Sequence, residues 1–228
     1  MTSATSNTSR GVLILLEGLD RAGKTTQCQI LHDKLAAIHG LDRVRVQKFP
    51  DRTTSIGSTI NSYLTSQSDL SDPAIHLLFS ANRWELRDAL LNSLKSGKII
   101  ILDRYVPSGV AYSLAKQNPD MPLEWCLAPD KGLPEPDLTI FLDIDPGKAH
   151  AQSAREDFGK ERYEVSEFQT IVRKNFKLLL GSQAQAGALK FGNVVTVDAT
   201  ESIETVAQSI WHAVESFKLT GPEITSIK

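Results

Sequence analysis

Short strand-like runs alternate along this chain with longer segments in which apolar residues recur three or four positions apart. The runs lie at residues 12–16, 44–48, 99–102, 138–142 and 194–197. The segments between them have the periodicity of helices that bury one face. Strands that alternate with helices in this way build a parallel sheet with helices packed against it. The pattern therefore predicts an α/β fold.

Capping and breaker residues position the helices between these runs. Asp72 followed by Pro73 predicts the start of one long helix that could reach Ser96, where Gly97 would stop it. Residues 118–136 are rich in proline and are expected to form a loop with one helical turn at 124–126. The remaining helices are expected at 26–38, 56–64, 108–116, 168–180 and 203–217.

The first run leads into Gly18-Leu19-Asp20-Arg21-Ala22-Gly23-Lys24-Thr25, which fits the phosphate-binding pattern G-x-x-x-x-G-K-[ST]. A helix follows directly, and this strand–loop–helix context argues against a chance match. Gly18 and Gly23 allow the backbone to curl so that its N–H groups point at phosphate oxygens. The helix N-terminus adds positive potential. Lys24 is expected to reach the β- and γ-phosphates, and Thr25 to bind Mg²⁺.

Length and charge narrow the class of protein. With 228 residues, the chain is expected to form one domain over residues 11–219, with a disordered tail at 1–10 and a C-terminal tail at 220–228. The net charge of −2 provides no broad basic surface for nucleic acid. No apolar run has the length of a membrane span. The two cysteines make neither a disulfide framework nor a metal-ligand spacing. We expect a cytoplasmic protein, with nuclear residence left open.

Two of the strand-like runs end in an aspartate, Asp103 and Asp143. On pattern alone, either could be the carboxylate that a P-loop protein places near Mg²⁺ and its waters. Asp103 is favoured because Arg104 follows it, which puts a group for the metal beside a group for a phosphate. The competing interpretation of Asp103 is a strand-end cap.

Three other groups have the chemistry of a nucleotide pocket. Arg52 follows the second run, at the sheet edge that faces the ligand crevice, and its guanidinium suits a second phosphate. Phe79 and Arg83 share one face of a helix, so that a ring could stack on a base while the arginine donates to its edge. Taken singly, such residues are more often core or surface positions.

The polar segment 146–164 contains few apolar anchors and a glycine, Gly159. Its composition suits a mobile lid more than a packed element. An exposed charged loop is the alternative, and composition alone favours it.

In this order, the motifs closely resemble those of the thymidylate kinase family, in the form typical of eukaryotes. The resemblance extends from Gly11 to about Phe217. It rests on the P-loop preceded by Glu17, and on Phe49-Pro50-Asp51-Arg52, Leu77-Leu78-Phe79-Ser80-Ala81-Asn82-Arg83-Trp84-Glu85, Asp103-Arg104-Tyr105, Ser108-Gly109-Val110-Ala111, residues 134–138, Glu161-Arg162-Tyr163-Glu164 and Phe168-Gln169.

This resemblance implies a fold, a reaction and an assembly. The fold is the three-layer P-loop NTPase fold of the nucleoside-monophosphate kinase type, with a five-stranded parallel sheet flanked by helices. The reaction is transfer of the γ-phosphate of ATP to dTMP in the presence of Mg²⁺, which yields dTDP and ADP for dTTP biosynthesis. The family is usually homodimeric, through helices that include the one carrying Phe79, and we expect a homodimer that binds neither nucleic acid nor membrane.

The resemblance also implies roles for single residues. The catalytic set is Asp20, Arg21, Lys24, Asp103 and Arg104, with Thr25 and Asp103 on the metal. The ATP site comprises Gly18, Asp20, Arg21, Ala22, Gly23, Lys24, Thr25, Thr26, Arg155, Ala199 and Glu201. The dTMP site comprises Arg52 and Arg104 on the phosphate, Phe79 and Arg83 on the base, Asp20 near the 3′-hydroxyl and Tyr163 at the 2′ side, together with Phe49, Gly109, Tyr112 and Gln169.

Arg21 lies inside the P-loop, where its side chain can reach the transferring phosphoryl group, so we expect it to act as an arginine finger. The alternative is that Arg21 only packs on the lid or pairs with a carboxylate such as Glu161. Local departures from the family affect the adenine side. The lid carries Glu156 and Asp157 where small residues are expected, and Glu201 is acidic where a basic residue can occur.

Two other classes of protein compete with this interpretation. A kinase of the same fold could act on another nucleoside monophosphate or on a deoxynucleoside. A deoxynucleoside has no phosphate for Arg52 and Arg104 to bind, which favours a monophosphate. A GTPase-like switch would need an Asn-Lys-x-Asp motif to read guanine, and the sequence has none.

Overall fold

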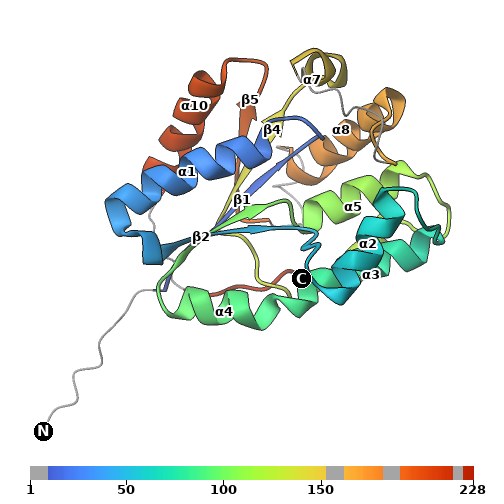
Figure 1. Ribbon diagram of the computed structural model, residues 1–228, viewed down its shortest axis with the longest axis horizontal. Helices are drawn as coiled ribbons and strands as arrows, with labels where there is room; N and C mark the ends of the chain where they lie inside the picture. The colour runs from blue at the N-terminus through green and yellow to red at the C-terminus, as the bar shows by residue number, and fades with distance from the viewer. Residues whose placement is uncertain (1–9, 153–161, 182–190, 218–222) are drawn as a thin grey trace, which may run out of the picture.

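A five-stranded sheet forms the centre of the computed structural model, which describes residues 10–152, 162–181, 191–217 and 223–228 (Figure 1). The strand order is β2-β3-β1-β4-β5, and all neighbours pair in parallel. Each predicted run yields a strand, so the expected α/β fold is confirmed. The strands are β1 (Leu13–Gly18), β2 (Val44–Lys48), β3 (Ile99–Asp103), β4 (Leu138–Asp143) and β5 (Asn193–Asp198).

Helices cover both faces of the sheet, as Figure 1 shows. On one face α1 (Lys24–His39) packs against α10 (Ile203–Glu215). On the other, α4 (Arg87–Lys95) packs on β3, and α5 (Val106–Ala115) packs on β1 and α8 (Ser166–Leu180). Farther out, α3 and α6 pack on α5, α2 on α3, and α7 on α8. These outer helices are α2 (Ser55–Leu64), α3 (Asp72–Glu85), α6 (Leu123–Leu127) and α7 (Pro146–Gln152); two 3₁₀ turns are η1 (Leu41–Arg43) and η2 (Ala128–Asp130).

The core follows the middle of the sheet. Every residue of β1 and of β3 is buried. Strands that are covered on both faces are apolar on both faces, which explains their continuous rather than alternating patterns. Each fully buried leucine or isoleucine there stabilises the fold by about 1.5–3 kcal/mol.

The topology creates a crevice at the carboxyl ends of the central strands. Strand β1 pairs with both β3 and β4, so that Leu16 lies opposite Asp103 and Gly18 opposite Leu142. The chain runs from β1 to β2 on one side of β1 and later crosses from β3 to β4 on the other, so the connections diverge beside β1 and a ligand site opens there. Gly18 has φ 151°, and a Cβ at this position would lie 2.6 Å from the Leu142 carbonyl oxygen. Only glycine fits where the chain turns into the P-loop.

The single long helix predicted from Asp72 toward Ser96 is wrong, because two helices occupy this segment. They meet at Leu86, whose φ of −101° and ψ of −4° and whose N–H bond to the Arg83 carbonyl close a tight turn. The turn lets α3 pack on α2 and α5 while α4 packs on β3. The N-cap position belongs to Ser71 rather than Asp72; Asp72 bonds to Lys116 and Asn118 instead.

The C-terminal residues 223–228 are part of the packed structure rather than a tail outside it. The Ile227 N–H donates to the Leu133 carbonyl at 2.9 Å, and the Gly132 N–H donates to the Ile227 carbonyl at 2.9 Å. Ile227 is buried. The expected domain boundary at residue 219 therefore omits a segment that closes over the loop before β4.

The predicted lid begins with a helix, α7, rather than an irregular segment, and resumes in the structure at Arg162. The expected tail up to residue 9 and the lid residues 153–161, Arg155 among them, lie outside the described residues. Among the helices that the structure describes, none is long and apolar enough to cross a membrane.

Candidate active site

The P-loop connects the buried end of β1 to the N-terminus of α1. Gly23 precedes α1 with φ 83°, a left-handed conformation that suits glycine. Lys24 is only 5 % exposed, and its Nζ donates to the Leu19 carbonyl at 2.5 Å, so the side chain lies back along its own loop. Burial lowers the pKa of Lys24 to about 8. The loop thus holds a desolvated cation at the start of a helix, where phosphates bind.

Thr25 and Asp103 face each other at the end of β3. The Thr25 hydroxyl donates to Asp103 Oδ2 at 2.6 Å. The other oxygen, Asp103 Oδ1, is buried and makes no hydrogen bond in the structure. A buried carboxylate oxygen without a partner beside a hydroxyl is a set of oxygen ligands that suits Mg²⁺.

Asp143, the other candidate for the metal, is engaged elsewhere. Arg173 Nε donates to Asp143 Oδ1 at 2.7 Å, and Lys177 Nζ lies 3.0 Å from Oδ2. Both cations come from α8 and neutralise the carboxylate. The geometry therefore supports Asp103 as the metal-side carboxylate and gives Asp143 a structural role.

Asp20 is the meeting point of three elements. Its carboxylate forms a short ion pair with Arg104, accepts from the Tyr112 hydroxyl at 2.9 Å and accepts from Gln169 Nε2 at 2.8 Å. Burial by itself would raise the pKa of Asp20, but Arg104 and Lys24 outweigh it, and the pKa is lowered. Asp20 is an anion at neutral pH that ties the P-loop to α5 and α8.

Arg104 sits in a strained turn between β3 and α5. Its φ is 69°, which costs a non-glycine residue about 1–2 kcal/mol. The turn is held in place because Arg104 Nη1 donates to the Gly18 carbonyl at 3.1 Å and to the Ser108 hydroxyl at 3.2 Å. The strained backbone conformation thereby directs the guanidinium of Arg104 toward the P-loop.

The carboxylate of Glu17 stabilises this turn by hydrogen bonds, a role that the motif analysis missed. Its Oε1 accepts the N–H groups of Tyr105 and Ser108 at 2.9 and 3.0 Å, and its Oε2 accepts the Ser108 hydroxyl at 2.6 Å. A carboxylate at a helix N-terminus is stabilised by the free N–H groups there. Burial raises the pKa of Glu17 despite these bonds. An acidic residue within an otherwise apolar strand was the signal that could have revealed it.

Arg52 lies in a loop that α3 fixes. Asn82, fully buried, accepts the Asp51 N–H at 2.7 Å and donates to the Asp51 carbonyl at 3.1 Å. Next to this clamp, Arg52 Nη1 donates to Asn61 Oδ1 at 2.9 Å. The loop thus brings a guanidinium from the end of β2 to the same cleft as Arg104.

Phe79 and Arg83 line that cleft from α3, as their spacing predicts. Arg83 is only 3 % exposed, and its Nε and Nη2 donate to the carboxylate of Asp130 at 3.0 and 2.6 Å. The remaining N–H groups of the guanidinium face Gly109, where a Cβ would lie 2.8 Å from Nη1. Asp130, which the sequence analysis did not single out, therefore fixes the arginine expected at the base.

Aromatic rings form the wall beside Asp20. Tyr163 stacks on Phe168, with ring centroids 5.2 Å apart and an interplanar angle of 12°, and lies 5.6 Å from the Tyr112 ring. Gln169 Nε2 donates to the Tyr163 carbonyl at 2.9 Å while it also holds Asp20. The structure brings Tyr112, Tyr163 and Gln169 together, but Gln169 lines the small cavity beside the P-loop rather than the cleft that Tyr112 and Tyr163 line.

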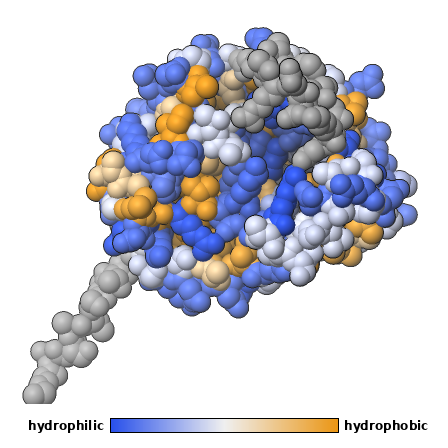
Figure 2. All heavy atoms as spheres, viewed as in Figure 1, coloured by the Kyte–Doolittle hydropathy of each residue, from blue (hydrophilic) through white to orange (hydrophobic). Residues whose placement is uncertain are grey.

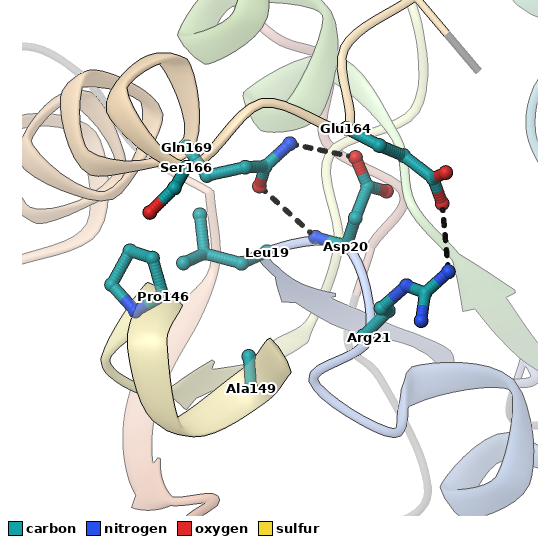
Figure 3. Close-up of a pocket in the computed structure, with 8 residues that line it drawn as sticks. All are labelled: Leu19, Asp20, Arg21, Pro146, Ala149, Glu164, Ser166 and Gln169. Atoms are coloured by element: carbon teal, nitrogen blue, oxygen red, sulfur yellow. Dashed lines mark hydrogen bonds and ion pairs between the residues drawn. The ribbon is translucent and has the colours of Figure 1, made fainter. Parts of the chain in front are cut away.

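Arg21 points toward Glu164, the last residue of the predicted lid, as Figure 3 shows. Its Nη2 lies 3.5 Å from Glu164 Oε1, so Arg21 has a carboxylate partner; Glu161, the partner considered above, lies outside the described residues. Between the P-loop, the start of α7 and the start of α8 lies a cavity of about 20 Å³, which is room for a single water. The P-loop and the lid base are thus in contact through Arg21.

One cleft of about 1010 Å³ joins these groups, at the upper end of the range of about 300–1,000 Å³ for single-ligand pockets. Figure 2 shows mainly hydrophilic residues around the hollow in the middle of this face. The predicted residues that line the cleft are Asp20, Arg21, Gly23, Lys24, Thr25, Thr26, Phe49, Arg52, Phe79, Arg83, Asp103, Arg104, Gly109, Tyr112 and Tyr163.

Some predicted residues lie outside this lining, within the part of the chain described here. Ala199 is buried and Glu201 exposed at the end of β5, and Ile203, two residues later, lines the cleft instead. Gly18 and Ala22 belong to the P-loop but do not line the cleft. The lining also includes residues to which the motif analysis gave no role, among them Lys48, Leu64, Thr65, Ile75, Ser108, Lys116 and Glu164.

Comparison with known proteins agrees with this geometry. The family model for thymidylate kinase matches residues 16–210. The chain is 48 % identical over 205 residues to a thymidylate kinase from Schizosaccharomyces pombe, covering 90 % of this chain and 92 % of the relative. It is 43 % identical over 201 residues to the human thymidylate kinase, covering 88 % of each chain.

A solved structure of thymidylate kinase from Candida albicans, reported to show the origin of broad substrate specificity, has a TM-score of 0.85 and 41 % sequence identity to this chain. It covers 97 % of this chain and 100 % of its own. Fold, sequence and the arrangement of the cleft point to one conclusion: the chain belongs to the thymidylate kinase family.

Proposed function

We propose that this protein transfers the γ-phosphoryl group of ATP to dTMP, giving ADP and dTDP. The observation that carries the proposal is the composition of the single cleft. It contains the P-loop lysine, Lys24, together with Arg52 and Arg104, which follow β2 and β3, and a base-sized aromatic ring, Phe79. One phosphate-binding loop and a separate pair of guanidinium groups suit a donor and an acceptor that both carry phosphate.

The donor half is built to hold charge in place. Lys24 and the N-terminus of α1 would bind the β- and γ-phosphates of ATP. Thr25 and Asp103 would hold Mg²⁺, because Asp103 Oδ1 is buried without a partner and both groups offer oxygen. When bound, Mg²⁺ neutralises charge on the phosphates. Little covalent chemistry is required of the protein, which acts by positioning and electrostatics.

The acceptor half would orient dTMP by its three parts. Arg52 and Arg104 suit the phosphate because guanidinium groups bind it bidentately. Phe79 offers a ring for the base, and Arg83, fixed by Asp130, offers N–H donors to its edge. The ring of Tyr163 and the carboxylate of Asp20, both in contact with Tyr112, would lie on the sugar side.

Arg21 would act on the transferring group itself. In the structure it contacts Glu164 at the base of the lid, next to the cleft. Moving its guanidinium from this carboxylate to the more strongly charged phosphoryl group would stabilise the transition state in the manner of an arginine finger. Arg155, in the lid, and Glu201 would lie on the adenine side.

A deoxynucleoside kinase of the same fold is the second candidate. It would leave Arg52 and Arg104 without an acceptor phosphate, so the cleft argues against it. ADP release from ATP, measured across a panel of nucleoside monophosphates and nucleosides, tests both. dTMP should be the best acceptor, well ahead of CMP, AMP and thymidine; if thymidine leads, the monophosphate assignment is wrong.

The proposal extends to assembly and location. Helix α3 presents Leu77, 46 % exposed, and Trp84, 38 % exposed, on its outer side. A two-fold partner on α3 would cover them, which supports a homodimer. A single monomeric species at micromolar concentration in sedimentation velocity would reject it. Both cysteines are buried and free, in keeping with a cytoplasmic enzyme of dTTP biosynthesis.

A further inference from the structure

A buried lysine lies in the acceptor half of the cleft without a part in the phosphoryl transfer described above. Lys116 follows the last residue of α5, one turn beyond Tyr112, and lines the cleft. Its side chain is only 8 % exposed. Lysine is almost never buried unless it is paired, so its surroundings indicate what it does.

Lys116 joins three elements. Its Nζ lies 3.0 Å from Asp72 Oδ1, at the start of α3, and donates to the Tyr63 hydroxyl at 3.2 Å, near the end of α2. The same ammonium group lies 5.3 Å from the centre of the Tyr63 ring and 5.5 Å from that of Tyr163. Asn118 donates to the other carboxylate oxygen of Asp72 at 3.3 Å. The cation is therefore held by an anion and a hydroxyl group, with two aromatic rings close by.

Tyr163 depends on this cluster at its hydroxyl end. Its hydroxyl donates to the Tyr63 hydroxyl at 3.4 Å. On the opposite side of the cluster, the guanidinium of Arg162 lies 4.1 Å from the centre of the Tyr63 ring, and its Nε donates to the Tyr63 carbonyl at 3.2 Å. Tyr63 thus lies between two cations and carries the hydroxyl that Tyr163 meets.

The rest of Tyr163 is fixed independently. Its ring stacks on Phe168, and Gln169 bonds to its carbonyl. A ring that is anchored at its backbone end and on one face can still tilt, which moves its hydroxyl end. A wall that discriminates between a hydrogen and a hydroxyl on the sugar has to resist such a tilt, because a shift of less than 1 Å makes room for an oxygen atom.

We propose that Lys116 is a positioning residue that holds the hydroxyl end of Tyr163 through Tyr63, and so sets the preference of the acceptor pocket for a deoxyribose over a ribose monophosphate. This inference rests on the proposed function. Lys116 acts through the two tyrosines and need not touch the acceptor. Its charge is what links Asp72 to both rings, so a neutral side chain of similar length does not replace it.

The test compares kcat/KM for dTMP with kcat/KM for the ribose analogue, 5-methyluridine 5′-monophosphate. This ratio does not depend on how much of a preparation is folded. Lys116→Met should lower the deoxy-to-ribo ratio about five- to tenfold, within the range expected for loss of a typical intramolecular hydrogen bond, with the KM for ATP unchanged. Tyr63→Phe keeps the ring but removes the hydroxyl link and should lower the ratio in the same direction. Lys116→Arg keeps the charge and should retain most of the selectivity.

Lys34→Met is the matched control. Lys34 Nζ also lies over an aromatic ring, 3.9 Å from the centre of Trp211, but on the far face between α1 and α10. Its loss should leave the ratio unchanged. If both Lys116→Met and Tyr63→Phe keep the wild-type ratio, or lose activity equally for both acceptors, the proposal is overturned. A wild-type protein that does not phosphorylate dTMP would instead refute the proposed function.

Discussion

Replacing Gly109 with alanine is predicted to displace Arg83 and weaken dTMP binding. A Cβ at position 109 would lie 2.8 Å from Nη1 and 2.9 Å from Nη2 of Arg83, whereas ordinary contact begins at 3.4 Å. A flexible side chain would usually move aside. Here Asp130 holds Nε and Nη2 at 3.0 and 2.6 Å, and both side chains are buried. The overlap is relieved only if the ion pair shifts.

The magnitude follows from two opposing effects. Overpacking of this kind costs about 1–3 kcal/mol. Alanine is favoured over glycine in a helix by about 1 kcal/mol, so the net loss of stability is small. In a domain of this size, each kcal/mol of lost stability lowers Tm by about 2–4 °C. The shift of Arg83 is not offset in this way. We expect the KM for dTMP to rise about tenfold, equivalent to about 1.4 kcal/mol, with the KM for ATP unchanged.

Steady-state kinetics with dTMP as the varied substrate, together with thermal unfolding, measures both effects. Gly147→Ala is the control, since it makes the same change in helix α7, where the nearest atom belongs to the half-exposed side chain of Asp145, 3.2 Å away. It should leave the KM for dTMP at the wild-type value. If Gly109→Ala also does so, either Arg83 does not contact the base or Asp130 does not hold it in place.

Four other predictions concern the proposed donor and acceptor sites. Arg21→Gly should lower kcat about a hundredfold or more with little change in KM, because an arginine finger acts in the transition state, and glycine adopts the φ of 65° at this position without strain. Arg155→Ala should cost less in kcat and more in ATP affinity, and the opposite order would move the catalytic arginine to the lid. Since burial lowers the pKa of Lys24 to about 8, the folded protein loses this proton, and with it kcat/KM for ATP, as pH rises through that value; a pH profile flat across it would contradict the assignment. Tyr163→Ala should reduce the deoxy-to-ribo ratio more than any Lys116 variant.

Features that depend on neighbouring residues could be predicted from the sequence. The P-loop is a contiguous pattern, and its glycines are required for steric reasons. The close approach of Gly18 to Leu142 illustrates this requirement. Strand-end groups such as Asp103 and Arg104 could be assigned to the crevice because parallel strands end at one edge. Phe79 and Arg83 shared a face because of helical spacing.

Features that depend on distant contacts could not be predicted in this way. Glu17 and Ser108 are 91 positions apart, and Arg83 and Asp130 are 47 apart. No local pattern indicates that these pairs meet. Cations on α8 engage Asp143, which favours Asp103 for the metal, and the break at Leu86 reflects the different surfaces on which α3 and α4 pack. Tertiary packing overrides local helix propensity at such sites.

Direct identification of the reaction product tests the central claim. The protein is incubated with ATP, Mg²⁺ and either dTMP or thymidine, and the phosphorus-containing products are followed by ³¹P NMR. We predict that dTMP and ATP are consumed in equal amounts, that dTDP and ADP appear together, and that thymidine gives no dTMP. Release of inorganic phosphate without dTDP, or conversion of thymidine to dTMP, would contradict the assignment of the cleft to phosphoryl transfer between two phosphorylated nucleotides.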